Sequence, residues 1–388
     1  MSWNAIIGQA RVKKLLKATL ENKRLAHAYL FSGPEGVGKD AAAIELAKIV
    51  NCTKKGINAC DDCPSCQNIG RLQHPNVNLV FALPVGKGEE KDDAPLTKLT
   101  EDDMKTIRKE IELKAGNPYH VIQIPKANNI KINSIREIRK ESSMTAFESG
   151  KKVFIIIAAE NLSDVSSNAL LKTLEEPHDD TLLILTTSQP DALLPTIISR
   201  CQHVRFDMLS VEEIQHSLQE RGIEKQQAVL IAQLSKGSFS RALELTETTL
   251  LERQADAVNF LRNALYKSQQ HILEDIERIF TEYQKDDIEE FFLLLQAWLQ
   301  SAMMAEEGYA SSGGAPIDET LRKFVQHHPD LRYTELLTST SRAISLLHKN
   351  VYIPLILLNL AIEVKKIILP SSVSKNMSAQ TAVVKGIS

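Results

Sequence analysis

The sequence of 388 residues lacks several features that would place it in a broad class at once. It has no apolar run long enough to span a bilayer. Residues 1–8 contain no charged segment followed by an apolar stretch, so no secretory signal is expected. Neither sign of charge prevails, because 46 Lys and Arg residues stand against 49 Asp and Glu residues. The net charge of −3 argues against a generally basic nucleic-acid-binding protein, and we expect a cytoplasmic chain with no membrane partner.

Cysteine is scarce, yet four of the five cysteines lie between residues 52 and 66. Two overlapping C-x2-C turns in residues 60–66 aim their sulfurs at one point. Four thiolates satisfy tetrahedral zinc and leave no open position, so the spacing predicts a structural Zn²⁺ site. The predicted ligands are Cys52, Cys60, Cys63 and Cys66. Disulfides or a redox-active pair are the alternatives, and Cys201 is expected to be a separate buried thiol.

Glycine is also infrequent, with 16 residues, but three glycines fall in one short loop. An apolar segment, residues 28–31, precedes the loop, and an amphipathic segment, residues 40–50, follows it. A strand, a glycine-rich turn and a helix in this order predict a phosphate-binding loop, in which backbone N–H groups, a helix N-terminus and a lysine surround a phosphate. The predicted nucleotide-binding residues of this loop are Gly33, Gly36, Gly38 and Lys39.

The magnesium ligands of a working ATPase are missing from the expected places. Asp40 stands where a Ser or Thr hydroxyl should follow the lysine, and Ile157 and Ala158 stand where acidic residues should end a later strand. Three interpretations stay open. The loop keeps its conformation but takes no part in catalysis, it binds ATP without hydrolysing it, or Asp40 and Glu160 form an altered magnesium site.

Strand and helix patterns alternate through the first two hundred residues, which predicts a doubly wound parallel sheet. Unbroken apolar runs at residues 152–157 and 181–187 indicate buried strands, and residues 203–206 a last strand. After residue 210 all patterns are helical, and residues 370–388 have no period and are expected to be disordered. A chain of this length suggests two or three domains.

An insertion at about residues 84–130 interrupts this alternation. Its charged run, residues 86–95, predicts a mobile surface loop, and residues 101–114 predict a helix with a solvated or partner-binding face. A second helix, capped by Asn133 or Ser134, carries a basic face that either follows DNA phosphates or is merely solvated. That basic face consists of Arg136, Arg139 and Lys140.

Five stretches taken together resemble the clamp loader of bacterial DNA polymerase III, an AAA+ assembly. They are residues 3–9, the phosphate-binding loop, the cysteine cluster, residues 168–177 (NALLKTLEEP) and residues 199–201 (SRC). Within that family the chain is most similar to the delta prime subunits. The ATP-hydrolysing gamma/tau subunits are less similar, because the magnesium positions are lost here while Arg200 is kept.

The resemblance implies a fold of three parts. These are an α/β P-loop AAA+ domain at residues 1–208 with a zinc module at 52–66, a helical lid at 209–250, and an all-α collar for oligomerisation at 251–369. It also places Thr187 at a first sensor position and Arg241 at a second, either of which could be a relic. Apolar residues of the collar are expected to dock on sister subunits, unless they form only the core of the bundle. These residues are Phe291, Phe292, Leu293, Leu294, Trp298 and the face at residues 355–368.

The function implied by the resemblance is that of a stator that does not hydrolyse ATP. Such a subunit helps to load the sliding clamp onto primed DNA, and Arg200 serves as an arginine finger for ATP and Mg²⁺ bound by a neighbouring subunit. The implied partners are the gamma/tau and delta subunits, with the clamp and DNA reached through the complex. An active gamma/tau-like ATPase with an altered magnesium site is the main alternative, and an independent DNA-binding module is a weaker one.

Overall fold

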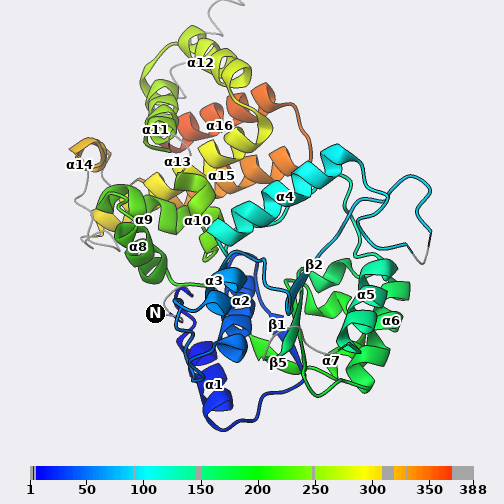
Figure 1. The fold of residues 1–388 in the computed structure, drawn as a ribbon. Helices are drawn as coiled ribbons and strands as arrows, with labels where there is room; N and C mark the ends of the chain where they lie inside the picture. The colour runs from blue at the N-terminus through cyan, green and yellow to red at the C-terminus, as the bar shows by residue number, and fades with distance from the viewer. Residues whose placement is uncertain are drawn as a thin grey trace, which may run out of the picture. The chain divides into compact units, whose positions relative to one another are not determined.

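The computed structural model describes residues 3, 6–90, 93–144, 150–246, 250–307, 319–328 and 331–368 (Figure 1). The chain forms two compact units, one of residues 1–217 and 235–243 and the other of residues 218–234 and 244–388. The segment expected to be disordered, residues 370–388, lies outside the described residues. The predicted division into three parts at residues 208 and 250 stays a prediction.

The first unit is built on a five-stranded parallel sheet with the strand order β2-β3-β4-β1-β5. The strands are β1 (Ala28–Ser32), β2 (Val77–Val80), β3 (Lys152–Ile156), β4 (Thr181–Thr187) and β5 (Gln202–Arg205). Every residue of β1, β3 and β4 is buried, as expected for strands covered on both faces. The ends of β1 and β4 meet where Ser32 lies beside Thr187. The predicted P-loop α/β fold class, with all-helical segments after it, is confirmed.

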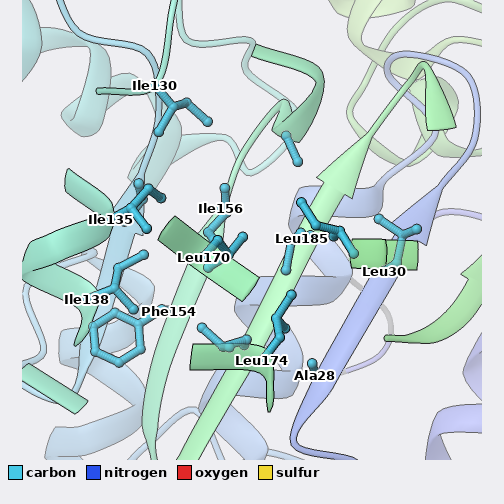
Figure 2. Packing of buried hydrophobic residues seen from close by; sticks show 14 of the residues in the cluster. Ala28, Leu30, Ile130, Ile135, Ile138, Phe154, Ile156, Leu170, Leu174 and Leu185 are labelled. Carbon is cyan, nitrogen blue, oxygen red and sulfur yellow. The ribbon is translucent and has the colours of Figure 1, made fainter. Parts of the chain in front are cut away.

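Helices α5 (Ile132–Ser142) and α6 (Asp164–Glu175) pack together over β3 and β4. Their apolar residues Ile135, Ile138 and Leu170 meet Phe154 in the core (Figure 2). The remaining helices of this unit are α1 (Ala10–Glu21), α2 (Lys39–Asn51), α3 (Pro64–Gly70), α4 (Glu101–Gly116) and α7 (Pro195–Ile198), with the short turns η2 (Ala159–Asn161) and η3 (Pro190–Ala192). Helices α8 (Val211–Glu220) and α10 (Phe239–Thr246) each begin in this unit.

Three expectations for the insertion and the helix after it need correction. Helix α5 begins at Ile132 after Lys131, and the Asn133 side chain is not a cap because its amide donates to Glu89 and Glu90. The described part of the charged run is anchored, since Glu89 also forms a buried ion pair of 2.6 Å with Lys131. Helix α4 is not merely solvated, because Ile107 and Lys114, two turns apart, are both buried.

The second unit is all-helical in the part of the chain that the structure describes. It contains α9 (Lys225–Leu234), α11 (Leu250–Tyr266), α12 (Gln269–Glu282), α13 (Lys285–Glu306), α14 (Glu319–His327), α15 (Tyr333–His348) and α16 (Ile353–Ile368). Phe291, Phe292, Leu294 and Trp298 of α13 are buried inside this unit and Leu293 is half-buried, so these residues form its own core. No described helix is both long enough and apolar enough to cross a membrane.

Candidate functional site: a phosphate-binding loop and a four-cysteine cluster

The phosphate-binding loop joins the end of β1 to the start of α2. The Gly33 N–H donates to Thr187 O over 3.2 Å, which fixes the loop to the neighbouring strand β4. Gly36 and Gly38 have φ angles of 74° and 99°, a region that glycine enters without strain. A Cβ at Gly36 would also lie 2.0 Å from Ser238 Oγ. The predicted loop conformation is therefore present, and α10 approaches it closely.

Lys39 is folded back onto its own loop. Its Nζ donates to Gly33 O at 2.7 Å and to Pro34 O at 2.6 Å. Burial lowers the pKa of Lys39, while the carboxylates of Asp40 and Glu160 act in the opposite direction. The ammonium thus has two neutral acceptors in the position from which it would otherwise reach a phosphate.

Asp40 is held by two groups that leave neither of its carboxylate oxygens free. Lys114 Nζ lies 2.6 Å from Oδ2, and Thr186 Oγ1 donates to Oδ1 over 2.7 Å. Burial alone would raise the pKa of Asp40, but the Lys114 charge and these hydrogen bonds hold it below its usual range. An altered magnesium site built on Asp40 would have to displace Lys114 first.

The other candidate magnesium ligand, Glu160, lies on η2 beyond the end of β3. Its Oε1 accepts hydrogen bonds from the N–H of Ser188, at 3.1 Å, and from the Ser188 hydroxyl, at 2.6 Å. Its Oε2 is buried with no hydrogen-bond partner among the described residues. Ile157 and Ala158 occupy the strand end itself, so that position offers no carboxylate.

Of the two predicted sensor residues, Thr187 is among the residues that line the pocket and Arg241 is not. The Thr187 hydroxyl accepts from the Gln189 N–H, whereas the adjacent Thr186, on the other face of β4, is the threonine that bonds Asp40. Arg241 lies exposed on α10, and Ser240 is the residue of that helix that lines the pocket. Sequence reasoning missed Thr186, because alternation along a strand does not show which face meets the loop.

Helix α4 and the segment after it also line the pocket, which the sequence did not predict. The cavity has a volume of about 260 Å³. Lys114 and Tyr119 from the insertion lie around it together with Lys39, Asp40 and Glu160. Ile107 and Lys114 are seven residues apart and lie on one face of α4, which is the buried face. A lysine at this position gives no sequence signal for an inward face.

Arg200 lies at the turn between α7 and β5. Its Nη2 is 2.8 Å from Glu175 Oε1, and its Nη1 donates to Thr196 O over 2.9 Å. The Arg200 side chain is 35% exposed, and an ion pair of this exposure contributes about 0–1 kcal/mol. The guanidinium is therefore held in place weakly and within reach of solvent. Cys201 is half-buried rather than fully buried, and burial raises the pKa of its thiol to about 12.

The four predicted zinc ligands come together. Cys52 follows α2, Cys63 caps α3, and Cys66 lies inside α3. All four sulfurs lie within 4.8 Å of one another, and those of Cys60 and Cys66 are 3.9 Å apart. Zn–S bonds of about 2.3 Å in a tetrahedron place sulfurs about 3.8 Å apart, so the cluster fits zinc.

The surroundings of the sulfurs also suit a structural metal. None of the five cysteines is disulfide-bonded, which removes the first alternative for the cluster. The N–H groups of Cys63 and Cys66 donate to the sulfurs of Cys60 and Cys63, each over 3.4 Å, and such bonds stabilise thiolates. Four thiolates fill the tetrahedral coordination of zinc and leave no ligand position open for a substrate, and three of the four cysteines are buried.

The basic face of α5 is exposed and extends onto α6. Arg136, Arg139 and Lys140 surround a hollow of about 470 Å³ together with Lys172 and His178. Glu176 is the one carboxylate among the residues lining it. The hollow is therefore predominantly basic, and α6 contributes to it in a way that the sequence did not indicate.

A glycine loop and a lysine between a buried parallel strand and its helix define a P-loop protein. The family described as DNA polymerase III, delta subunit, matches residues 8–210, and the chain belongs to this family. It is 32% identical over 263 residues to DNA polymerase III subunit delta' of Bacillus subtilis, covering 68% of this chain and 67% of that protein.

Subunit tau of the same organism is 29% identical over 252 residues, but the chain spans only 37% of its length. A solved structure of a DNA polymerase III gamma subunit-related protein from Thermotoga maritima covers 92% of this chain and 99% of its own at 15% identity. Its TM-score of 0.35 is too low to bear on function.

Proposed function

We propose that this chain is a stator subunit of the DNA polymerase III clamp loader that does not hydrolyse ATP. The observation that carries the proposal is the state of Asp40, whose two oxygens are bonded to Lys114 and Thr186. Phosphoryl transfer needs a metal ion to neutralise charge on the phosphates. Here the hydroxyl ligand after Lys39 is absent, and the end of β3 carries Ile157 and Ala158.

The isolated chain is expected to hydrolyse ATP only at the background rate, because both parts of the magnesium site are missing. The measurement is steady-state phosphate release from Mg-ATP by the full chain, with Asp40→Thr as a matched variant. Restoring the hydroxyl alone should not restore turnover, since the carboxylate at the end of β3 is still absent. Magnesium-dependent turnover by the wild-type chain that disappears in Lys39→Met would overturn the proposal.

Arg200 supports a role in a neighbouring ATP site. A guanidinium is planar and permanently charged, and it can donate two parallel hydrogen bonds to phosphate oxygens. Arg200 is half-buried at the turn between α7 and β5 and stays within reach of solvent, while its own pocket lacks the magnesium ligands. We infer that it acts on ATP and Mg²⁺ held by a gamma/tau subunit, in a cytoplasmic complex that carries the clamp and primed DNA.

Assembly is proposed to use the second unit. Helices α12 and α16 pack against each other, and each leaves apolar side chains exposed. Leu273 and Phe280 belong to α12, and Leu355 and Ile362 to α16, with Leu355 57% exposed. This distribution supports a collar, although the α13 residues first expected to dock are buried in the core of the unit.

Leu355→Asp is expected to weaken assembly with the gamma/tau and delta subunits, because a charge on the α16 surface would have to be desolvated. Residues at the centre of an interface are worth about 2 kcal/mol or more. Co-elution in size-exclusion chromatography measures the loss, and Val165→Asp on α6 controls for a new charge at another exposed apolar position. Unchanged co-elution of Leu355→Asp would rule out α16 as a docking surface.

A further inference from the structure

The insertion places a tyrosine directly on the phosphate-binding loop. Tyr119 follows α4 and is only 4% exposed. Its hydroxyl accepts a hydrogen bond of 2.7 Å from the N–H of Ile7, and its ring packs edge-on against Phe239 at a centroid distance of 5.0 Å. The Ser240 hydroxyl donates to its carbonyl. Tyr119 is thus held from three sides, all within the first unit.

The ring of Tyr119 covers the last glycine of the loop. A Cβ built on Gly38 would lie 2.8 Å from the tyrosine hydroxyl. The backbone from Gly33 to Lys39 is the part of a P-loop that must face a phosphate. Tyr119 therefore lies in contact with the surface that a nucleotide would have to approach.

Lys114 fills the pocket next to the tyrosine. It is 1% exposed, and its Nζ bonds both Asp40 Oδ2 and His120 O at 2.6 Å. The turn that carries these residues is itself fixed, because Glu110 accepts from the Gln123 N–H and lies 2.9 Å from His120 Nε2. The ammonium of Lys114 is thus paired with Asp40, which is the residue that follows the loop lysine.

The space left is small. The cavity of about 260 Å³ is below the roughly 300–1,000 Å³ typical of small-molecule sites. The two charged side chains beside the loop also have partners within the chain, since Lys39 bonds loop carbonyls and Asp40 bonds Lys114. A nucleotide would have to break these bonds as well as find room.

We propose that residues 114–122 form an internal plug that occupies the nucleotide pocket and closes it to nucleoside triphosphates. The plug deepens the proposed function and rests on it, because it turns a site that lacks its magnesium ligands into one that does not bind ATP at all. It also gives the insertion a role, which is to stabilise the loop in the absence of nucleotide.

The test is binding of a fluorescent ATP analogue, with Mg²⁺, to the full chain. The wild-type chain is expected to show no saturable binding up to the highest analogue concentration tested. Tyr119→Ala is expected to bind saturably, with a Kd at least about tenfold below that concentration, a gain of at least about 1.4 kcal/mol. Adding Lys39→Met to Tyr119→Ala should remove the gain, which would locate the analogue at the loop. Tyr266→Ala, at an exposed tyrosine of the second unit, is the matched control and should behave as the wild type.

Saturable wild-type binding that Lys39→Met abolishes would overturn the plug, and so would a folded Tyr119→Ala variant without any gain. If Tyr119→Ala does not fold, hydrogen exchange of the wild-type amides from Ile7 to Lys39 decides the matter. The plug predicts no change on adding Mg-ATP, and added protection would contradict it. Wild-type binding without hydrolysis would leave the stator proposal intact, whereas hydrolysis would remove both.

Discussion

Replacing Arg200 with alanine is expected to abolish most of the ATP hydrolysis at the one neighbouring site that this arginine faces. Arginine fingers are worth about 10³–10⁵ in rate because they stabilise charge that develops on the transferred phosphoryl group. The other ATP sites of the complex do not depend on Arg200, so total turnover should fall by less. Folding should be unaffected, since the variant loses only a partly exposed pair with Glu175 and a bond to Thr196 O.

The measurement is clamp- and DNA-stimulated ATP hydrolysis by a complex reconstituted with gamma/tau and delta subunits. Arg200→Lys should rescue little, because an ammonium cannot reproduce the two parallel hydrogen bonds of a guanidinium. Glu175→Gln is the matched control, since it weakens the resting contact of Arg200 and leaves the guanidinium in place. A complex with Arg200→Ala that hydrolyses ATP and loads clamps at the wild-type rate would disprove the role in trans.

Loss of the metal is expected to produce the largest effect on stability. Structural zinc binds zinc-finger peptides with about 10–16 kcal/mol, and this binding energy is also folding energy. In a larger domain only part of it is coupled to folding, so Cys63→Ser should lower the free energy of unfolding by about 3 kcal/mol or more. For a unit of this size such a loss corresponds to a decrease in Tm of about 6–12 °C.

Elemental analysis and thermal unfolding of chain purified without chelator test this expectation. The wild-type chain should contain one zinc per molecule, and Cys63→Ser much less. Cys201→Ser is the matched control, because this thiol lies outside the cluster and should leave zinc content unchanged. Wild-type protein with well under one zinc per chain would show that the four sulfurs have another role.

Features with a local cause could be predicted from the sequence. The strands β3 and β4 are unbroken apolar runs, and the P-loop is a short glycine motif. The four predicted zinc ligands lie within fifteen consecutive residues. Each of these depends on neighbouring residues only, so the pattern and the structure agree.

Features that depend on contacts between distant residues could not be predicted. Lys114 meets Asp40 across 74 positions, and Tyr119 meets Ile7 across 112. A lysine in a charged helix is usually solvated, so burial at Lys114 follows from the path of the insertion and not from its composition. The same reason applies to α13, where Phe291 and Trp298 are buried in the structure. The apolar pattern of this helix fits a bundle core and a subunit interface equally well, so the sequence could not decide between them.

The central claim is that this chain serves the ATP site of a neighbour and not one of its own. Stimulated ATP hydrolysis by the reconstituted complex tests it most directly when Lys39→Met and Arg200→Ala are compared side by side. The account predicts wild-type turnover with Lys39→Met and a large loss with Arg200→Ala. A loss with Lys39→Met and wild-type turnover with Arg200→Ala would contradict it.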